Sequence, residues 1–434
     1  MPQTLAQTIR GNIETVRKDV LPNIFRVDDQ YVTSRLIGKM EKYQITKTQN
    51  GLDFRAPLKM QPSGRYSFAN YAGGSLGTGG KADIEQLYQT YFPQKLVYQL
   101  DFQAIVGTKQ SELARYNAWK DSMKEAIELA QRYLDVGFHT IGGSQGVIMQ
   151  AAGWDGTSVM TAAASNMADL MLIGQTVEIW DTTLTTNRTS GLSGDSLPVV
   201  ANVAPDQSYV TLGNLGSVSG ITGTDKLLLP GQGVTPSGPN GLQYFNDTST
   251  ANSVLGLSKT TYPDMAASGF PANGATYQVA FALRCRHQIE QRRGDVSKLI
   301  GLMPLAQSAA INLSVSTQAT FLRTKPTENM IDPLLQIGDS QPWGGILHIP
   351  DLHQARDRVD YVMEGNWGMV YLNDSAPDFY KAPGSNEIFF SPVSTTDGTT
   401  LFSSLFAIIW ENNWYNVDPG RSAVVTGLQK PAGY

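Results

Sequence analysis

Apolar and polar residues alternate along two stretches between Tyr43 and Ile105. The apolar positions are Tyr43, Ile45, Leu52 and Phe54 in the first stretch, and Leu96, Tyr98, Leu100, Phe102 and Ala104 in the second. A period of two is typical of strands with one buried face, and the glycine-rich segment Gly73–Gly80 between them predicts a hairpin tip. So long a hairpin cannot bury both faces on one adjacent helix. We therefore expect it to lie on another molecule, with packing inside its own domain as the alternative.

A second periodicity follows directly, with apolar residues every three or four positions from Thr108 to Val136. They are Leu113, Tyr116, Trp119, Met123, Ile127, Ala130 and Leu134. This spacing predicts one amphipathic helix that stops at Gly137. At about 1.5 Å per residue the helix is roughly 40 Å long, which suits a spine across a plate-shaped subunit. A coiled-coil seam is the alternative, although the stripe lacks the heptads that would support it.

The remaining chain divides into segments that differ in residue composition and in apolar periodicity. Residues 1–42 contain patches of amphipathic helix between Pro2 and Pro22. Residues 182–275 are rich in Thr, Ser, Gly and Asn, with short apolar runs between turns, and predict an inserted β-rich subdomain, with low-complexity linker as the alternative. A helix over 277–292, a strand over 298–303 and apolar C-terminal strands predict an α/β or α+β plate.

Composition favours a covered surface. With 434 residues, 41% of them hydrophobic, the chain can bury two or three cores. Charged residues make up only 16%, below the usual quarter, which favours a subunit of a large assembly, although a β-rich secreted protein shares this composition. The net charge of −5 argues against a dedicated nucleic-acid binder. One predicted helix carries four basic residues, which we interpret as a solvent-exposed face rather than a nucleic-acid contact: Arg284, Arg286, Arg292 and Arg293.

The single cysteine, Cys285, excludes a disulfide framework within the chain and fits a reducing compartment. Phe281, Ala282 and Ile289 stand at helical spacing from it, so we expect a buried, inert thiol. We expect no signal peptide at the N-terminus and no membrane span, because no apolar run reaches about eighteen residues.

Motifs that carry chemistry are scarce. Of the four histidines, only His348 and His353 lie near each other, beside Asp351 and Asp357, and their spacing matches no zinc motif. The chain contains neither a G-x-S-x-G elbow nor a phosphate loop. We therefore predict no catalytic, cofactor-binding or metal-binding residues and no enzyme activity. The main enzyme alternative is a β-rich secreted glycoside hydrolase whose tryptophans stack on sugars: Trp343, Trp367, Trp410 and Trp414.

The order of these predicted elements resembles that of the major capsid proteins of tailed double-stranded DNA bacteriophages, which share the Hong Kong phage-type capsid fold. Four short segments look like sequences common in that family: Gly241–Tyr244, Gly256–Pro263, Asn366–Gly368 and Asp418–Arg421. None of them is a catalytic signature. The resemblance spans nearly the whole chain, although its motifs are loose.

The resemblance implies an α+β fold with an N-terminal arm, an extended β-hairpin loop, a long spine helix, an axial α/β plate domain and an inserted β-rich subdomain. The implied divisions are 1–42 for the arm, 43–105 for the hairpin loop, 106–143 for the spine helix of the peripheral domain, 144–181 for the start of the axial domain, 182–275 for the insertion, 276–400 for the axial domain and 401–434 for the return to the peripheral domain.

The resemblance also implies a structural protein that self-assembles into hexamers and pentamers of an icosahedral head around double-stranded DNA, without sequence-specific DNA binding and without a membrane. The implied location is the virion, after assembly in the bacterial cytoplasm. The implied partners are a scaffold, a portal and a decoration protein. Members with a fused scaffold carry a charged helical extension that this chain lacks, so we expect a separate scaffold, with a scaffold-free route as the alternative. An encapsulin-like compartment is the alternative within the same fold. On the predicted hairpin, Arg55, Lys59 and Arg65 are candidate contacts to acidic groups of a neighbouring subunit.

Overall fold

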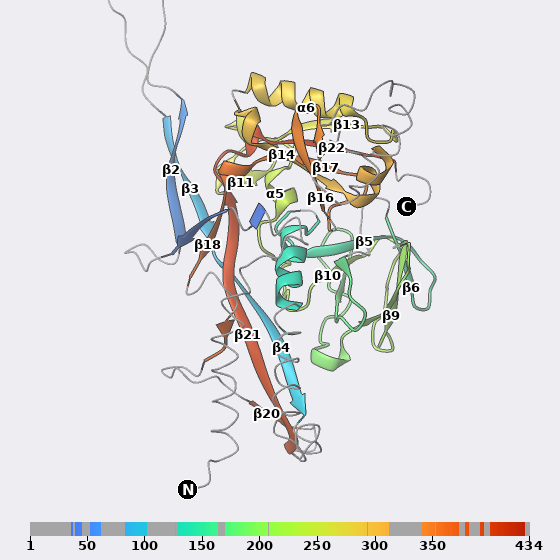
Figure 1. The fold of residues 1–434 in the computed structure, drawn as a ribbon. Coiled ribbons are helices and arrows are strands. Elements are labelled where there is room, and N and C mark those ends of the chain that lie inside the picture. The colour runs from blue at the N-terminus through green and yellow to red at the C-terminus, as the bar shows by residue number, and fades with distance from the viewer. Residues whose placement is uncertain are drawn as a thin grey trace, which may run out of the picture.

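The computed structural model describes residues 36–37, 40–45, 53–61, 83–101, 126, 129–141, 143–163, 170–206, 208–292, 294–311, 341–351, 353–372, 378–381, 391–394 and 400–429. Three six-stranded sheets and two separate two-stranded hairpins make up the sheet structure of these residues (Figure 1). Most of the predicted N-terminal arm, the tip Gly73–Gly80 and most of the helix predicted over 108–136 lie outside the described residues.

The first sheet is organised by β21 (Thr400–Asn416), the 17-residue strand that runs from beside β11 to β20 in Figure 1. Its antiparallel partners are β4 (Phe92–Asp101), β18 (Trp367–Tyr371), β19 (Asp378–Phe379) and β20 (Ser391–Ser394). The short strand β1 (Glu41–Gln44) joins β18 in parallel. This sheet therefore unites the early, middle and late parts of the chain.

The predicted hairpin over 43–105 is shorter in the structure. Its two strands are β2 (Asp53–Gln61) and β3 (Asp83–Thr90), which pair antiparallel from Asp53 opposite Thr90 to Gln61 opposite Asp83. The prediction put residues 96–104 on the return limb, but β4 pairs with β21 instead. Alternation with period two identifies a strand and its buried face; it carries no information about the partner strand.

The second sheet lies at the other end of the subunit from β20. Its strand order is β13 (Ser268–Pro271), β22 (Ala423–Thr426), β17 (Val359–Met363), β14 (Leu299–Pro304), β16 (Ile346–Asp351) and β15 (Gln341–Trp343). The helix α6 (Val279–Gln291) covers one face, with Phe281, Cys285 and Ile289 in the core beneath it (Figure 1). Residues 305–311 form another helical segment directly after β14.

The third sheet is built around the first part of the segment predicted as β-rich. Its order is β7 (Glu178–Trp180), β10 (Lys226–Leu228), β5 (Val147–Trp154), β6 (Val159–Ala162), β9 (Tyr209–Gly213) and β8 (Val199–Val203). Two of these strands precede residue 170, so the sheet begins before the predicted insertion. The end of the predicted insertion folds elsewhere, as α5 (Leu242–Phe245), the hairpin of β11 (Ser253–Val254) and β12 (Leu257–Ser258), and β13. Short 3-10 turns connect these elements: η3 (Gly194–Ser196), η4 (Pro263–Met265), η5 (Val296–Lys298), η6 (Glu364–Asn366) and η7 (Pro419–Arg421).

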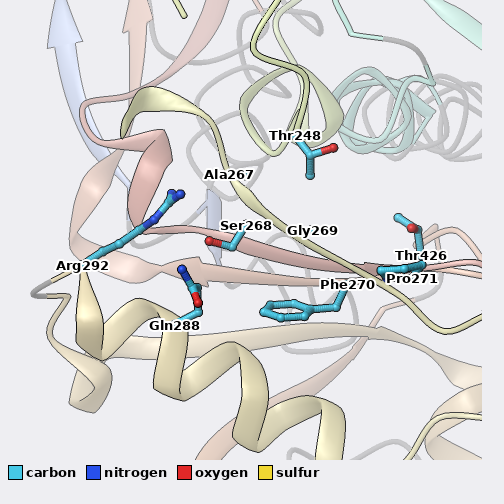
Figure 2. Close-up of a pocket in the computed structure, with 9 residues that line it drawn as sticks. All are labelled: Thr248, Ala267, Ser268, Gly269, Phe270, Pro271, Gln288, Arg292 and Thr426. Atoms are coloured by element: carbon cyan, nitrogen blue, oxygen red, sulfur yellow. The ribbon is translucent and has the colours of Figure 1, made fainter. Parts of the chain in front are cut away.

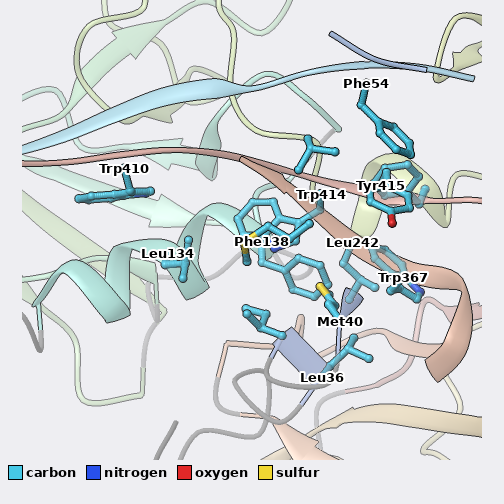
Figure 3. Packing of buried hydrophobic residues seen from close by; sticks show 14 of the residues in the cluster. Leu36, Met40, Phe54, Leu134, Phe138, Leu242, Trp367, Trp410, Trp414 and Tyr415 are labelled. Atoms are coloured by element: carbon cyan, nitrogen blue, oxygen red, sulfur yellow. The ribbon is translucent and has the colours of Figure 1, made fainter. Parts of the chain in front are cut away.

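An aromatic cluster joins the helical segment 129–138 to the first sheet (Figure 3). Residues 129–138 are helical, so the helix extends one residue beyond the predicted stop at Gly137. The Phe138 ring makes edge contacts with Trp414, at 5.3 Å between centroids, and with Trp367, at 5.4 Å. Because these side chains are fully or almost fully buried, they fix the helix end against β18 and β21.

Candidate assembly surface

The β2–β3 hairpin, here called the arm, projects from the body of the subunit beside β18 (Figure 1). Its inward face is anchored at the base. Phe54 of β2 stacks on Tyr415 at 4.8 Å between ring centroids, and Leu87 of β3 is buried. The Gln89 side-chain amide donates to the backbone carbonyl of Trp414 over 2.8 Å, and the Asn240 amide donates to Gln89 over 2.8 Å.

Two further contacts hold β3 to the β11–β12 hairpin and to the turn that follows it. The backbone amide of Tyr88 donates to the carbonyl of Leu255 over 3.0 Å. The Tyr262 hydroxyl donates to Glu85 over 2.9 Å and to Asp83 over 3.1 Å. The hydrogen bond to Glu85, reinforced by burial and by the charge of Asp83, raises the pKa of Tyr262 to about 12.

The outward face of the arm carries apolar side chains that the described chain leaves largely exposed. Ile84 is 61% exposed and Tyr88 is 45% exposed, and both lie on the side of β3 opposite Leu87. The exposed guanidinium of Arg55 stands over the Tyr88 ring at 5.7 Å, in cation–π contact. The arm therefore presents an apolar and basic strip to its surroundings.

The three predicted contact residues fall differently on this arm. Arg55 is opposite Tyr88 in the register and is exposed on the outward face. Lys59, four residues after Arg55 on β2, is opposite Ile84 in the same register. Arg65 lies outside the described residues. Ile84 and Tyr88 were missed by the sequence reasoning. Local alternation did not mark them, because the inward positions of β3 are mostly polar: Asp83, Glu85, Leu87 and Gln89.

A shallow pocket of about 540 Å³ lies along β13, an edge strand that pairs only with β22 (Figure 2). Gln288 of α6 and Arg292, which follows that helix, approach it from one side. The Nη1 atom of Arg292 donates to the carbonyls of Ala266 and Gly420, each over 2.6 Å. Arg292 is the only charged side chain among the residues lining this pocket, so the pocket offers no acid–base pair for hydrolysis.

The tryptophans considered for sugar stacking are core residues wherever their side chains are described. Trp367, Trp410 and Trp414 are at most 3% exposed and belong to the cluster in Figure 3. Their rings therefore have no face for a polysaccharide. The Cys285 thiol is buried as predicted, and burial raises its pKa, so it is not a reactive nucleophile at neutral pH.

The paired histidines of the sequence separate in the structure. The Nε2 atom of His348 lies within hydrogen-bond distance of two hydroxyl groups, those of Tyr277 at 2.9 Å and Tyr361 at 3.2 Å. The Nδ1 atom of His353 instead contacts the carboxylate of Asp135, in the helical segment 129–138. Asp135, His139 and Asp351 form a buried group whose donor atoms all lie within 4.8 Å of one another, close enough to hold a metal ion.

This buried group favours positive charge. The Nδ1–H of His139 donates to the backbone carbonyl of Asp135 over 3.0 Å, and Nε2 lies 2.9 Å from a carboxylate oxygen of Asp351. Burial alone lowers the pKa of His139, but Asp351 and Asp135 outweigh it and raise that pKa to about 9. No sequence signal marked this pair, because the predicted helix stopped at Gly137 and His139 lies beyond it.

Comparison with solved structures identifies the fold. A chain in the capsid asymmetric unit of cyanophage A-1(L) superposes with a TM-score of 0.51 and 11% sequence identity, covering 92% of this chain and 93% of that one. A chain of the satellite phage P4 procapsid, whose structure includes the size determination protein, matches at 0.41 with 8% identity, over 99% and 92% of the two chains. The capsid of a native GTA particle matches at 0.41 with 9% identity, over 92% and 90%.

No family model matches this sequence, and no curated protein matches it. The cyanophage comparison covers nearly the full length of both chains. The chain therefore has a phage capsid fold, of mixed helix and strand with strands predominating. No helix among the described residues is both long and apolar enough to cross a membrane.

Proposed function

We propose that this chain is a structural major capsid protein of a tailed phage, which assembles into the hexamers and pentamers of an icosahedral head around double-stranded DNA. The observation that carries the proposal is the full-length match to a chain of the cyanophage A-1(L) capsid. A role in a shell also accounts for the low content of charged residues, because a subunit covered by neighbours on several sides exposes little surface to water.

The arm supports the same proposal. Its inward face is anchored on the subunit through Phe54, Leu87 and Gln89, while its outward face keeps Ile84 and Tyr88 exposed. Apolar side chains on a projecting ribbon are costly in water unless a partner covers them. In the proposed shell the partner is a neighbouring copy, in a heterologous contact that closes around a symmetry axis.

Charge gives this contact a direction. Arg55 is exposed on the outward face, and the backbone of Lys59 pairs with that of Ile84 further along the same ribbon. The chain as a whole has a net charge of −5, so an acidic surface on the neighbour is the expected counterpart. We propose no sequence-specific DNA contact; the shell encloses its cargo, and a scaffold, a portal and a decoration protein complete the particle in the host cytoplasm.

The first test is to express the full chain and examine it by size-exclusion chromatography and negative-stain electron microscopy. Closed shells, tubes or capsomer rings are expected, alone or with the scaffold protein of the same particle. A chain that remains monomeric under both conditions and cleaves a polysaccharide would contradict the proposal. Shell diameter separates a phage head from a smaller encapsulin-like compartment.

A second test reverses the charge of the arm. The double variant Arg55→Glu, Lys59→Glu is expected to fold with an unchanged circular dichroism spectrum and to form no closed shells. The matched control is Arg55→Lys, Lys59→Arg, which keeps the positive charge and is expected to assemble. Normal shells from the charge-reversed variant would remove the basic strip from the assembly contact.

A further inference from the structure

Half of the histidines of this chain meet at one buried point. The sequence contains four histidines, and two of them, His139 and His353, lie in the core with Asp135 and Asp351. Asp135 and His139 are four residues apart in the helical segment 129–138 and the turn that ends it, so their side chains share one side of the helix. Asp351 ends β16 and His353 follows two residues later. Two short sequence spacings from distant parts of the chain thus supply four metal-ligand side chains.

The four side chains contact one another directly. His139 Nε2 lies 2.9 Å from Asp351 Oδ2, His353 Nδ1 contacts Asp135 Oδ2, and the backbone amide of His353 donates to Asp351 Oδ1 over 3.1 Å. All four residues are at most 6% exposed. Their mutual contacts therefore lie in a region of low dielectric, where two carboxylates require a compensating positive charge.

Two features resemble the surroundings of a metal rather than an ordinary ion pair. The Nδ1–H of His139 is held by the backbone carbonyl of Asp135, which orients the ring and directs Nε2 to the carboxylates, as in metal-ligating histidines. The Nε2 atom of His353 is buried and has no hydrogen-bond partner within the described part of the chain. That nitrogen lies on the far side of the ring from Asp135, so the second feature is the contact of His353 Nδ1 with the Asp135 carboxylate, of the kind that orients ligating carboxylates.

We infer that Asp135, His139 and Asp351 bind one divalent cation of the zinc class, and that His353 supports the Asp135 carboxylate through Nδ1. Imidazole nitrogen combined with carboxylate oxygen suits zinc, whereas magnesium and calcium prefer oxygen alone. The expectation from the sequence, that the chain holds no metal, considered only His348 together with His353. The fold separates that pair and brings His353 to the helix.

The bound cation would join two parts of the subunit. Asp135 belongs to the helical segment 129–138, which packs on the first sheet, and His139 follows it, while Asp351 ends β16 of the second sheet and His353 lies two residues later. The cation would therefore be a structural crosslink at the junction of these sheets. The inference does not rest on the proposed function, because a single purified subunit suffices to test it.

The experiment measures zinc in the full-length protein after mild chelation, reloading and desalting, by elemental mass spectrometry and by titration. Cobalt replaces zinc in a parallel sample, because its visible spectrum reports nitrogen and oxygen ligands. Wild-type protein is expected to retain about one equivalent. The variants His139→Gln, His353→Gln and Asp351→Asn are each expected to bind at least about tenfold more weakly.

The matched control is His287→Gln, which removes an exposed histidine of α6 and is expected to bind zinc like the wild type. Wild-type protein that retains no zinc overturns the inference, whatever the variants do, so a variant that fails to fold cannot protect it. Equal binding by wild type and all three variants also overturns it, since the zinc would then be held elsewhere. Assembly into shells is scored separately, so its failure is distinguishable from failure to bind the metal.

Discussion

The strands of the arm and those of the second sheet are buried in opposite ways. Every residue of β14 and β17 is buried, because α6 covers one face of their sheet and the core of the subunit covers the other. In β3 the inward residue Leu87 is buried, while Ile84 and Tyr88 on the outward face are exposed. A strand sealed on both faces stabilises its own subunit, whereas an apolar strand sealed on one face has its second cover in another molecule.

The largest expected effect on stability comes from removing a buried side chain from the strand that is covered on both faces. Leu302 of β14 is 0% exposed, and Leu302→Ala deletes buried methyl groups and leaves a cavity. We expect the free energy of unfolding to fall by about 2–5 kcal/mol, measured by urea denaturation of the unassembled subunit. Leu283→Ala on the exposed side of α6 is the control, with an expected change below about 0.5 kcal/mol. Equal effects would show that burial does not distinguish the positions.

A smaller effect is expected where the body holds the arm. The β11–β12 turn has positive φ at Leu255, 50°, and at Gly256, 81°, as a two-residue hairpin of type I′ requires. The carbonyl of Leu255 accepts from Tyr88 of the arm, so the turn geometry sets the position of β3. Gly256→Ala is expected to cost about 1 kcal/mol, measured by thermal or urea unfolding, because alanine is strained at this φ.

Gly216→Ala is the matched control for that turn. Gly216 does not have a positive φ, and nothing lies within 4 Å of an added methyl group. Alanine is expected to be neutral or slightly stabilising there. A Gly256→Ala variant that is as stable as Gly216→Ala would contradict the role of the left-handed turn.

The polar anchor of the arm is open to a pKa measurement. Glu85→Gln removes the strongest influence on Tyr262, so the pKa of that phenol should fall from about 12 toward its ordinary value of 10.0. Because the folded pKa lies above the ordinary one, the anchor is fully present below pH 10 and is lost as the pH rises through 12. Titration of ring-labelled tyrosine by NMR, assigned with Tyr262→Phe, measures the shift. Glu290→Gln on α6 should leave it unchanged.

The sequence predicted local elements better than their partners. The helix expected over 277–292 is confirmed by α6 at Val279–Gln291, and the strand expected over 298–303 by β14 at Leu299–Pro304. Both have continuous apolar periodicity, which local spacing records. The pairing of β4 with β21 joins residues more than 300 positions apart, as Tyr98 opposite Phe406 illustrates, and no local pattern encodes it.

The candidate sites follow the same division. The basic position of Arg55 on the arm was visible in the sequence, because alternation assigns it a face. The association of His353 with Asp135 was not, since the two residues are separated by 218 positions and meet only when β16 packs beside the helix end. The role of the tryptophans was open for a related reason. In a sequence, aromatic residues are equally consistent with burial in a core and with binding of a ligand, and only the fold distinguishes the two.

The smallest change in the unfolding free energy is expected on the outward face of the arm, and it sharpens the comparison most. Ile84→Ser removes a side chain that is 61% exposed, so the stability of the unassembled subunit should change by less than about 0.5 kcal/mol. If a neighbouring copy covers Ile84, the same variant should lose closed shells in electron micrographs, because its apolar area is buried only on assembly. Ile84→Leu keeps that area and should assemble. Shells from Ile84→Ser at wild-type yield would contradict the proposal that a neighbouring copy covers the outward face. A stable subunit that no longer assembles would show that the residues that fold this chain differ from those that join it to its copies.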